Sequence, residues 1–428
     1  MDSFVVKGSA GKAELSGTIA VGGAKNAALP IMAAALMVEG EVALGNVPSI
    51  ADVAAMAKLL EGLGAFVTRE GAAMSIRSGE ASGTVFDDAT AKSLRASILL
   101  TAPVLARNGQ VTFPHPGGDV IGERPIDIFI SSFEKLGAHT ERTDSHYTLS
   151  APQGLSGGEI FFRIVSVTAT EALMIAATRA TSPVTLYNAA LEPEVVALAN
   201  FLNACGGRVE GAGTSTIVIF PSHLRMSDIG SHSFQIIPDR IEAATFLVLG
   251  ALAGKDITVT GVEPQHLMAV TDALVRMGVP LVIHGEGQSI RVRAPRTLLP
   301  IRLRTHEYPG FPTDAQPPFA VLLTQADGES DLIESIFDGR LNYTAELVRM
   351  GANIEVVNPH KAIIKGTSTL KARDIDGPDI RAGLAFLLAA AIADGESRIG
   401  NAHLIDRGYE MIETKLTAVG LPIRREKS

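Results

Sequence analysis

Residues 51–68 read ADVAAMAKLLEGLGAFVT, and this stretch contains a pattern that recurs along the chain. Apolar residues at helical spacing predict an amphipathic helix, which Gly64 closes before a strand begins. Just upstream, residues 27–48, AALPIMAAALMVEGEVALGNVP, predict an apolar helix, a glycine break and a short strand over 41–44. Together the two stretches form one helix–strand–helix–strand unit. The apolar face of its second helix consists of Val53, Met56, Leu59 and Leu60.

The same unit returns five more times along the chain. Glycine tolerates the positive φ that a helix C-terminus often needs, so a glycine that recurs there has a physical cause. Neighbouring glycines of this kind lie 73, 69, 72, 73 and 69 residues apart, which indicates a fold built from repeats. They are Gly64, Gly137, Gly206, Gly278, Gly351 and Gly420.

The first helix of each unit is apolar on nearly all sides, as in IMAAALMV (31–38), ATFLVLGAL (244–252) and GLAFLLAAAI (383–392). A helix without a polar face belongs inside a domain, whereas the amphipathic second helices are expected to be partly solvated. We therefore predict an α/β protein in which three units pack around buried helices, with the strands outside, to make one domain. Two such domains account for the length of the chain.

The N-terminal residues 1–20 contain the strand-like segments FVVKG and AELSGTIAV, ahead of the first unit. We expect them to complete the sheets of the second domain, so that the chain crosses near Gly22-Gly23 and again near Pro238-Asp239. This predicts one domain at 23–238 and a second at 1–22 plus 239–428. Ligands usually bind in clefts between domains, so we expect the active site there.

Composition excludes several classes of function. A net charge of -9 argues against nucleic acid as the main partner, because phosphate binding needs a basic surface. One cysteine, Cys205, excludes an intramolecular disulfide, and we expect it to be a buried thiol at a helix end. The ten histidines show no metal-ligand spacing. With no signal peptide and no apolar run of about 18 residues, we expect a cytoplasmic protein that does not enter the membrane.

Residues 112–125, TFPHPGGDVIGERP, predict a loop, because their glycines and prolines exclude a helix interior and a central strand. Asp119 lies at its centre and Arg124 follows five residues later. An acid beside a cation on a glycine-hinged loop is typical of a lid that carries a catalytic proton donor. An ordinary surface turn is the alternative at this point.

Charged residues also stand where the buried helices are expected to begin. The helix dipole favours anions at that end, so a cation there is unusual. A helix N-terminus together with a basic side chain can hold phosphate or carboxylate. A solvated cap or a salt bridge between domains is the alternative for each residue. These residues are Lys25, Asn26, Arg95, Asp239, Arg240, Asp314, Asp379 and Arg381.

Three of the charged candidates have alternatives of their own. Asp314 lies in EYPGFPTDAQPPF (307–319), a loop that leads into a helix, so helix capping would also explain it. Arg340 and Arg407 each follow a strand and a turn, and a surface ion pair worth less than about 1 kcal/mol would account for either.

Motifs spread over essentially the whole chain resemble those of the enolpyruvyl transferases, in particular the branch that acts on UDP-N-acetylglucosamine. The resemblance implies a two-domain inside-out α/β barrel of six repeated βαβαββ units. It implies transfer of the enolpyruvyl group of phosphoenolpyruvate to the 3′-hydroxyl of UDP-N-acetylglucosamine, with release of phosphate and without metal or organic cofactor. That reaction is the first committed step of peptidoglycan synthesis. The motifs are GGAKNAALP, LRAS, GGDVIGERPID, SVTATEALM, EPEVV, PDRIEAATF, FPTDAQ, FDGR and IDRGYE.

The same resemblance implies roles for single residues. Asp119 would stand in for the family's lid cysteine, which donates a proton to C3 of phosphoenolpyruvate. Asp314 would take the proton of the sugar hydroxyl, and Asp379 would assist the tetrahedral step. Lys25 and Arg407 complete the catalytic set, with both expected to neutralise the donor's negative charges. The residues expected to bind the two substrates are Lys25, Asn26, Arg95, Arg124, Pro125, Ile126, Asp127, Ile128, Ser166, Val167, Asp314, Ile336, Arg340 and Arg407.

Three departures from the family pattern bear on these roles. With aspartate for cysteine at Asp119, the protein should not be alkylated by fosfomycin, which acts on the thiol. A family lysine is replaced by Ile164, although Arg163 stands next to it, and a family glycine is replaced by Thr168. Both of these lie on the nucleotide-sugar side, so they leave the acceptor open.

Two further readings therefore remain beside the main one. In the first, the acceptor is another UDP-sugar, a nucleotide or shikimate 3-phosphate. In the second, the protein is a non-catalytic paralogue that binds the nucleotide sugar. For the main reading we expect a monomer whose partners are its two small-molecule substrates.

Overall fold

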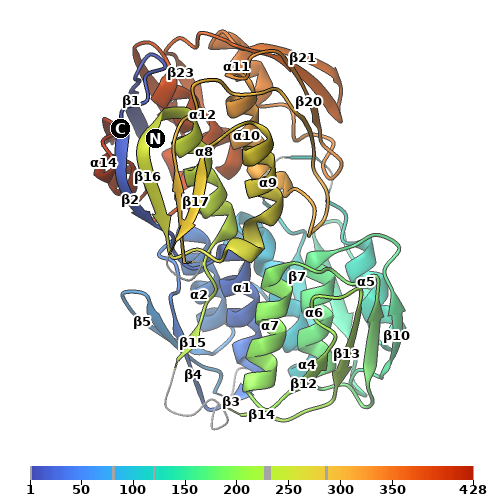
Figure 1. The fold of residues 1–428 in the computed structure, drawn as a ribbon. Helices are drawn as coiled ribbons and strands as arrows, with labels where there is room; N and C mark the ends of the chain where they lie inside the picture. The colour runs from blue at the N-terminus through green and yellow to red at the C-terminus, as the bar shows by residue number, and fades with distance from the viewer. Residues whose placement is uncertain are drawn as a thin grey trace. The chain divides into compact units, whose positions relative to one another are not determined.

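The computed structural model describes residues 2–79, 82–118, 121–122, 124–225, 233–284 and 288–427. The chain forms two compact units (Figure 1). Unit 1 consists of Met1–Gly22, Asp119–Glu123 and Pro238–Ser428, and unit 2 consists of Gly23–Gly118 and Arg124–Ile237. The sequence had assigned all of 23–238 to one domain, whereas the tip of the loop after Gly118 groups with unit 1. Within the described ranges, no helix has the length and apolar character needed to cross a bilayer.

The recurring glycines end the second helices as predicted. All six have φ between 80° and 108°, the left-handed region that favours glycine. At Gly64 the glycine N–H donates to the carbonyl of Glu61 (2.9 Å), and the N–H of Ala65 donates to the carbonyl of Leu60 (3.0 Å). The other five glycines repeat this pair of bonds, which defines a Schellman motif. The repeat seen in the sequence is therefore present in the fold.

Unit 2 has three buried first helices, which are α1 (Lys25–Ala34), η2 (Arg95–Leu100) continuing as α4 (Thr101–Asn108), and α6 (Val167–Ala177). Its second helices are α2 (Ala51–Gly62), α5 (Asp127–Lys135) and α7 (Pro193–Ala204). One sheet has the order β15 (Phe234–Gln235), β4 (Glu41–Gly45), β6 (Ala73–Arg77), β5 (Phe66–Glu70). The next has the order β7 (Gln110–Pro114), β9 (His146–Ser150), β8 (His139–Arg142). The third has the order β10 (Gly158–Phe161), β11 (Val184–Tyr187), β13 (Thr216–Phe220), β12 (Arg208–Glu210).

Unit 1 has the buried helices α8 (Arg240–Ala253), α10 (Gln316–Leu323, preceded by η5, Thr313–Ala315) and α12 (Ile380–Ile392). Further helices of this unit are α9 (Met268–Arg276), α11 (Thr344–Arg349), α13 (Ala402–Ile405) and α14 (Ile412–Ala418). One sheet has the order β17 (Leu281–His284), β18 (Ser289–Val292), β16 (Gly254–Thr260), β2 (Leu15–Ala20). The next has the order β19 (Arg302–Arg304), β20 (Glu329–Ile333), β22 (Lys361–Lys365), β21 (Asn353–Asn358). The third has the order β23 (Asp374–Asp376), β24 (Glu396–Gly400), β1 (Ser3–Lys7), β25 (Ile423–Glu426).

The N-terminal strands complete two sheets of unit 1, as the sequence predicted. Strand β1 lies between β24 and β25 and runs antiparallel to both. Strand β2 pairs in parallel with β16. Figure 1 shows β2, in blue, beside β16, which comes much later in the chain. Strand β16, which follows the buried helix α8, has the parallel neighbour β2 and the antiparallel neighbour β18. Strand β24, which follows α12, has the parallel neighbour β23 and the antiparallel neighbour β1.

The buried helices form the centre of each unit. Every residue of α12 is buried, and in α8 only Arg240 is not fully buried. In unit 1 the helices α8, α10 and α12 contact one another pairwise. Close packing also needs small residues, since a Cβ added at Gly250 in α8 would lie 2.2 Å from the side chain of Val292 in β18.

One second helix differs from the prediction that these helices are partly solvated. Helix α7 is buried along most of its length because it packs against both α1 and α6. Its C-terminal cap is Cys205, whose thiol is buried as predicted.

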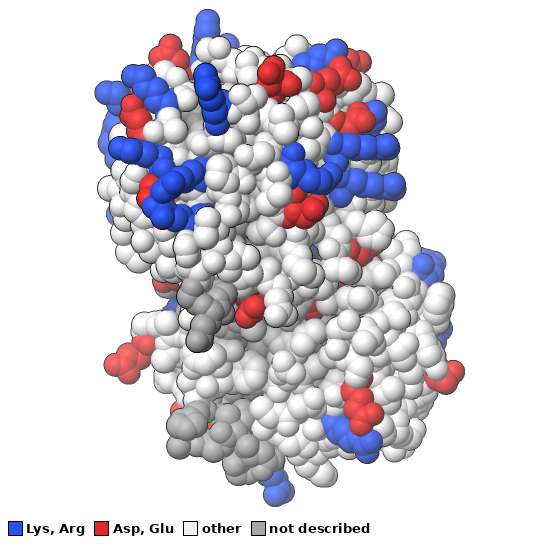
Figure 2. Space-filling view, in the orientation of Figure 1, with Lys and Arg blue, Asp and Glu red and all other residues white. Residues whose placement is uncertain are grey.

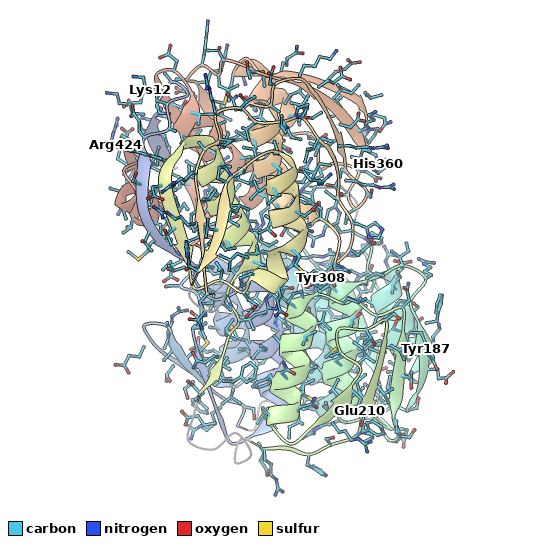
Figure 3. The ribbon with its side chains drawn as sticks, viewed as in Figure 1. Lys12, Tyr187, Glu210, Tyr308, His360 and Arg424 are labelled. Atoms are coloured by element: carbon cyan, nitrogen blue, oxygen red, sulfur yellow. The ribbon has the colours of Figure 1, made fainter. Side chains whose placement is uncertain are left out.

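Polar and apolar side chains are both exposed on the sheets. Tyr187 and Glu210 lie on strands of unit 2, Arg424 lies on β25 of unit 1, and His360 lies in the turn between β21 and β22 (Figure 3). Phe161 in β10 is an exposed apolar example. On the face of unit 1 seen in Figure 2, lysine and arginine side chains lie beside aspartate and glutamate. One such pair joins Arg424 to Glu396 at 3.0 Å. Positive and negative charges are thus interspersed on this face.

The helix-ending glycines generate a stability prediction with a control in the same helix. Replacement of Gly64 by alanine should destabilise the protein by about 1–2 kcal/mol, because alanine is strained at φ 96°. Gly62 lies in α2 itself with open space around its Cα, so Gly62→Ala should stabilise by about 0.5–1 kcal/mol. Denaturant unfolding of both variants measures the difference. Equal effects of the two substitutions would contradict a conformational role for Gly64.

Candidate active site

The predicted base Asp314 is held by two buried arginines in unit 1. Its Oδ1 accepts a hydrogen bond from Nη2 of Arg340 at 2.7 Å. Its Oδ2 accepts a hydrogen bond from Nε of Arg381 at 3.1 Å and forms an ion pair with Nη2 of the same guanidinium at 2.9 Å. The arginine side chains are 2% and 4% exposed, whereas that of Asp314 is 28% exposed. The carboxylate of Asp314 is therefore accessible to solvent and contacts two buried guanidinium groups, whose positive charges stabilise its negative charge.

This geometry excludes two of the alternatives left by the sequence. The N-cap of η5 is Pro312, and no side chain caps this helix, so Asp314 is not its cap. Arg340 is not in a surface ion pair, because it is almost completely buried and also donates to the carbonyl of Thr313 at 3.1 Å.

Arg381 is held in turn by Tyr409. Its Nη1 donates to the Tyr409 hydroxyl at 3.1 Å, and its Cζ lies 5.4 Å from the centre of the ring. Burial opposes the charge of Arg381, but Asp314 and then Tyr409 outweigh it and raise the pKa of the guanidinium above its ordinary value. For Tyr409 burial acts in the opposite direction, because the charged form of tyrosine is the deprotonated one. Burial raises the pKa of Tyr409, so its hydroxyl keeps its proton at neutral pH.

Glu334 is a buried residue that the sequence analysis missed. Its Oε1 accepts from the backbone N–H groups of Ile336 (2.8 Å) and Phe337 (3.2 Å). Its Oε2 accepts from the hydroxyl of Thr313 at 3.0 Å. One carboxylate thus joins the turn that carries the predicted substrate residue Ile336 to the residue preceding Asp314.

The other predicted residues of unit 1 lie at the ends of helices. Asp379 is the N-cap of α12, where its Oδ1 accepts from the N–H groups of Arg381 and Ala382 at 2.8 and 3.0 Å. Asp239 caps α8 in the same way. Arg407 is partly buried on the turn after α13, two residues before Tyr409.

In unit 2, Lys25 is the first residue of α1 and pairs with Asp52 at 3.2 Å. Asp52 lies in the first turn of α2, and both side chains are largely buried. The acid offsets the cation at a helix N-terminus, where the dipole alone would disfavour it. Asn26, next in the chain, is exposed.

Arg95 and Arg124 lie together beside the glycine-rich loop. Nη1 of Arg95 donates to the carbonyl of Pro116 at 3.3 Å, and its Nη2 donates to the carbonyl of Arg124. A Cβ at Gly118, where φ is 120°, would lie 2.8 Å from Arg95 and 3.3 Å from Arg124, so this approach requires glycine. Burial, together with the charge of Arg124, lowers the pKa of Arg95 to about 10. A bound anion would offset that repulsion.

The residues predicted for the nucleotide sugar lie at the starts of two helices of unit 2. Asp127 begins α5, preceded by Pro125 and by the cap Ile126, and Ile128 follows it. Ser166 caps α6 by accepting from the N–H of Ala169 at 3.3 Å, and Val167 is the first residue of α6. Helices α5 and α6 contact each other.

The departures in this region have visible consequences. Ile164, where the resemblance implies a lysine, is 59% exposed, as are several other large apolar side chains of this protein. Its neighbour Arg163 pairs with Asp127, so this cation contacts the predicted nucleotide-sugar residues.

The predicted proton donor Asp119 lies outside the described residues. Close to it in the chain, Ile121 accepts a hydrogen bond through its carbonyl from the N–H of Gly339 at 3.1 Å, and both residues belong to unit 1. Gly339 lies in the FDGR motif next to Arg340.

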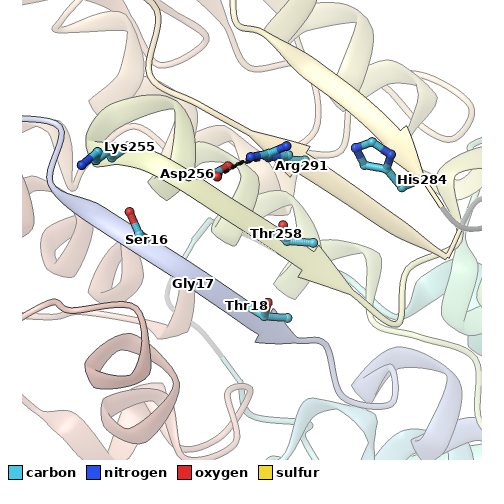
Figure 4. A pocket seen from close by; sticks show the side chains of 8 residues that line it. All are labelled: Ser16, Gly17, Thr18, Lys255, Asp256, Thr258, His284 and Arg291. Atoms are coloured by element: carbon cyan, nitrogen blue, oxygen red, sulfur yellow. Dashed lines mark hydrogen bonds and ion pairs between the residues drawn. The ribbon is translucent and has the colours of Figure 1, made fainter.

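A surface depression of about 530 Å³ lies elsewhere, on the sheet of β2 and β16–β18 (Figure 4). None of the predicted site residues lines it. Arg291 and Asp256 form an ion pair there, with 2.5 Å from Nε to Oδ1. Among the residues that the structure describes, no group of three or more His, Cys, Asp or Glu side chains is arranged to hold a metal ion.

The structure thus brings the predicted residues together within each unit. Unit 1 joins Asp314 to Arg340, and unit 2 places Arg95 beside Arg124. Three residues that the sequence did not indicate are buried partners of residues that it did. Asp52 pairs with Lys25, Glu334 accepts from the N–H of Ile336, and Tyr409 accepts from Arg381.

Comparison with known proteins identifies the family. Residues 9–416 match the family EPSP synthase (3-phosphoshikimate 1-carboxyvinyltransferase). The chain is 42% identical over 421 residues to UDP-N-acetylglucosamine 1-carboxyvinyltransferase 1 of Symbiobacterium thermophilum, which covers 97% of this chain and 94% of the relative. It is 43% identical over 430 residues to UDP-N-acetylglucosamine 1-carboxyvinyltransferase of Acidobacterium capsulatum, covering 99% and 96%.

Solved structures show the same fold. The enolpyruvyl transferase NikO from Streptomyces tendae superposes with a TM-score of 0.88 at 22% identity, over 100% of this chain and 99% of that one. EPSP synthase from Acinetobacter baumannii gives a TM-score of 0.74 at 17% identity, over 100% of both chains. The two-domain α/β fold predicted from the repeats is confirmed. With a family match over nearly all of its length, this chain belongs to the EPSP synthase family of enolpyruvyl transferases.

Proposed function

We propose that this enzyme transfers the enolpyruvyl group of phosphoenolpyruvate to the 3′-hydroxyl of UDP-N-acetylglucosamine and releases phosphate. The observation that carries the proposal is the carboxylate of Asp314, partly exposed and held by the buried Arg340 and Arg381. A base for a sugar hydroxyl has to be charged, reachable and fixed in direction, and this carboxylate is all three. The names of the relatives identified above support the same donor and acceptor.

The reaction divides into an addition and an elimination. In the addition, Asp314 takes the proton of the 3′-hydroxyl, the hydroxyl oxygen bonds to C2 of phosphoenolpyruvate, and C3 receives a proton from Asp119. In the elimination, C3 returns a proton to the carboxylate of Asp119, the C2–C3 double bond forms again, and the bond from C2 to the phosphate oxygen breaks as phosphate leaves. Asp379 assists at the tetrahedral stage between the two steps.

The donor carries several negative charges, so cations must meet it in a site that excludes water. We assign this role to Lys25, Arg124 and Arg407, with Asn26 as a further contact. Like charges that repel one another before binding, as Arg95 and Arg124 do, favour an anionic ligand.

The nucleotide sugar would lie against the starts of two helices. The capped N-terminus of α6, at Ser166 and Val167, presents N–H groups of the kind that bind phosphate. Arg95, the segment Pro125–Ile128 and Ile336 complete this part of the site. We place the enzyme in the cytoplasm as a monomer that catalyses the first committed step of peptidoglycan synthesis, and thus contributes to cell-wall biogenesis, cell shape and division.

The first test compares acceptors. Purified protein with phosphoenolpyruvate should release phosphate in the presence of UDP-N-acetylglucosamine and much less with shikimate 3-phosphate, another UDP-sugar or a nucleotide. The replacement of an implied lysine by Ile164 leaves the alternative of a different acceptor open, and faster turnover with one of these compounds would establish it. Binding of the nucleotide sugar without turnover would instead identify a non-catalytic paralogue.

The second test concerns the base. Asp314→Asn keeps the shape of the side chain but cannot accept the proton, so kcat should fall by roughly 10²–10⁴-fold. Asp256→Asn is the matched control, because Asp256 also pairs with two arginines, Arg291 and Arg293, on the outer face of a sheet. Steady-state phosphate release should be unchanged in the control. Equal activity of the two variants would remove Asp314 from the reaction.

The third test concerns the loop. Asp119→Asn should abolish nearly all turnover, since an amide cannot donate the proton to C3. Fosfomycin should add no mass to the native protein, whose single cysteine is buried, whereas Asp119→Cys should gain a covalent adduct on the loop peptide. Mass spectrometry of the intact protein and of its peptides checks both statements. Time-dependent inactivation of the native protein with a loop adduct would contradict them.

A further inference from the structure

A chain of buried hydrogen bonds leads away from Asp314 into the core of unit 1. Its central residue is Tyr409, which is 1% exposed. The Tyr409 hydroxyl lies 3.1 Å from Nη1 of Arg381 and 3.0 Å from Oγ1 of Thr245. Thr245 is on α8 and Arg381 is on α12, so the tyrosine connects two of the three buried helices to the turn that follows α13.

The donors and acceptors of this chain have one consistent direction. A guanidinium only donates, so the Tyr409 oxygen accepts from Arg381. The Thr245 hydroxyl donates its own hydrogen to the carbonyl of Ile241 at 3.0 Å. Hence the hydroxyl hydrogen of Tyr409 goes to Thr245, and the chain ends on the backbone of α8. Every hydroxyl in it both donates and accepts.

This chain determines where Arg381 points. Nη1 of the guanidinium is bound to Tyr409, and Nε and Nη2 are directed at Oδ2 of Asp314. Because the guanidinium is planar and rigid, fixing Nη1 also fixes the two groups that face the carboxylate. Arg340 holds only the other oxygen, Oδ1. Without the Tyr409 hydroxyl, Arg381 would lose one of the contacts that define its orientation.

We propose that Tyr409 is a positioning residue for the reaction, which orients Asp314 through Arg381. This inference rests on the proposed function, in which Asp314 takes the proton of the acceptor hydroxyl. Tyr409 touches neither substrate in this role. A base must be directed at its proton to well within an ångström, so loosening its support lowers the rate of the chemical step more than it weakens binding.

A second buried tyrosine of unit 1 provides a matched control. The hydroxyl of Tyr343 donates to Oε1 of Gln316 at 3.1 Å, and burial raises its pKa well above the ordinary value. None of the hydrogen bonds described for it reaches Asp314, Arg340 or Arg381. Tyr343→Phe therefore removes a buried hydroxyl from the same unit without breaking the chain to Asp314.

The experiment measures kcat and KM for both substrates in the native enzyme, Tyr409→Phe and Tyr343→Phe, together with melting temperature. Tyr409→Phe should lower kcat by about tenfold or more, with KM within about twofold of the native value. Tyr343→Phe should keep kcat within about twofold of the native value. Its melting temperature should fall by about as much as that of Tyr409→Phe. Thr245→Val removes the acceptor at the end of the chain and should lower kcat in the same direction, which keeps the proposal testable if Tyr409→Phe does not fold.

The outcomes separate this inference from the function on which it rests. Absence of turnover by the native protein with every acceptor would overturn both. Native turnover with an unchanged kcat in Tyr409→Phe and in Thr245→Val would overturn the positioning role alone. An equal loss of kcat in Tyr409→Phe and Tyr343→Phe, in step with melting temperature, would also overturn it, because the hydroxyl would then act only through stability.

Discussion

The structure depends on one constraint, which is that apolar helices are buried on all sides at the centre of each unit. Such a helix has no face on which to carry polar side chains. Its free N–H groups still need partners, and only its ends reach a polar environment. Most of the charged site residues therefore lie at the starts of these helices and in the loops that lead into them, whereas Thr245 within α8 is a buried polar exception. Ser166, Asp239 and Asp379 are such caps, and Lys25 and Arg95 are first residues of their helices.

The same constraint explains why the charged residues occur in sets. Burial of a charge is costly unless it is paired, and removal of one member of a buried pair costs about 3–5 kcal/mol. Arg340 and Arg381 are buried because Asp314 accepts from both, and Lys25 is largely buried because it pairs with Asp52. Uncharged buried groups complete these sets, as the Tyr409 hydroxyl does for Arg381. The reactive side chains are thus the partly exposed members of networks whose other members lie in the core.

Several features could be predicted from the sequence because they depend on local backbone geometry. The glycine that ends each second helix has a positive φ, and this local requirement left a regular spacing that is readable in the chain. The burial of the first helices follows from composition alone. By contrast, α7 was predicted to be partly solvated because its pattern is amphipathic, and it is buried by contacts with α1 and α6 that no local pattern contains.

By itself the sequence determined the repeat, the two-unit architecture with helices inside, the family, and the motif residues such as Asp314 and Arg124. Local conformation and residue type are sufficient for these, because each is written within a few consecutive residues. Only the tertiary structure decided which buried residues contact these motifs. Asp52, Glu334 and Tyr409 lie 27, 21 and 28 positions from the residues Lys25, Thr313 and Arg381 that they contact. Contacts across such separations arise when helices and turns pack, and packing is a property of the folded chain.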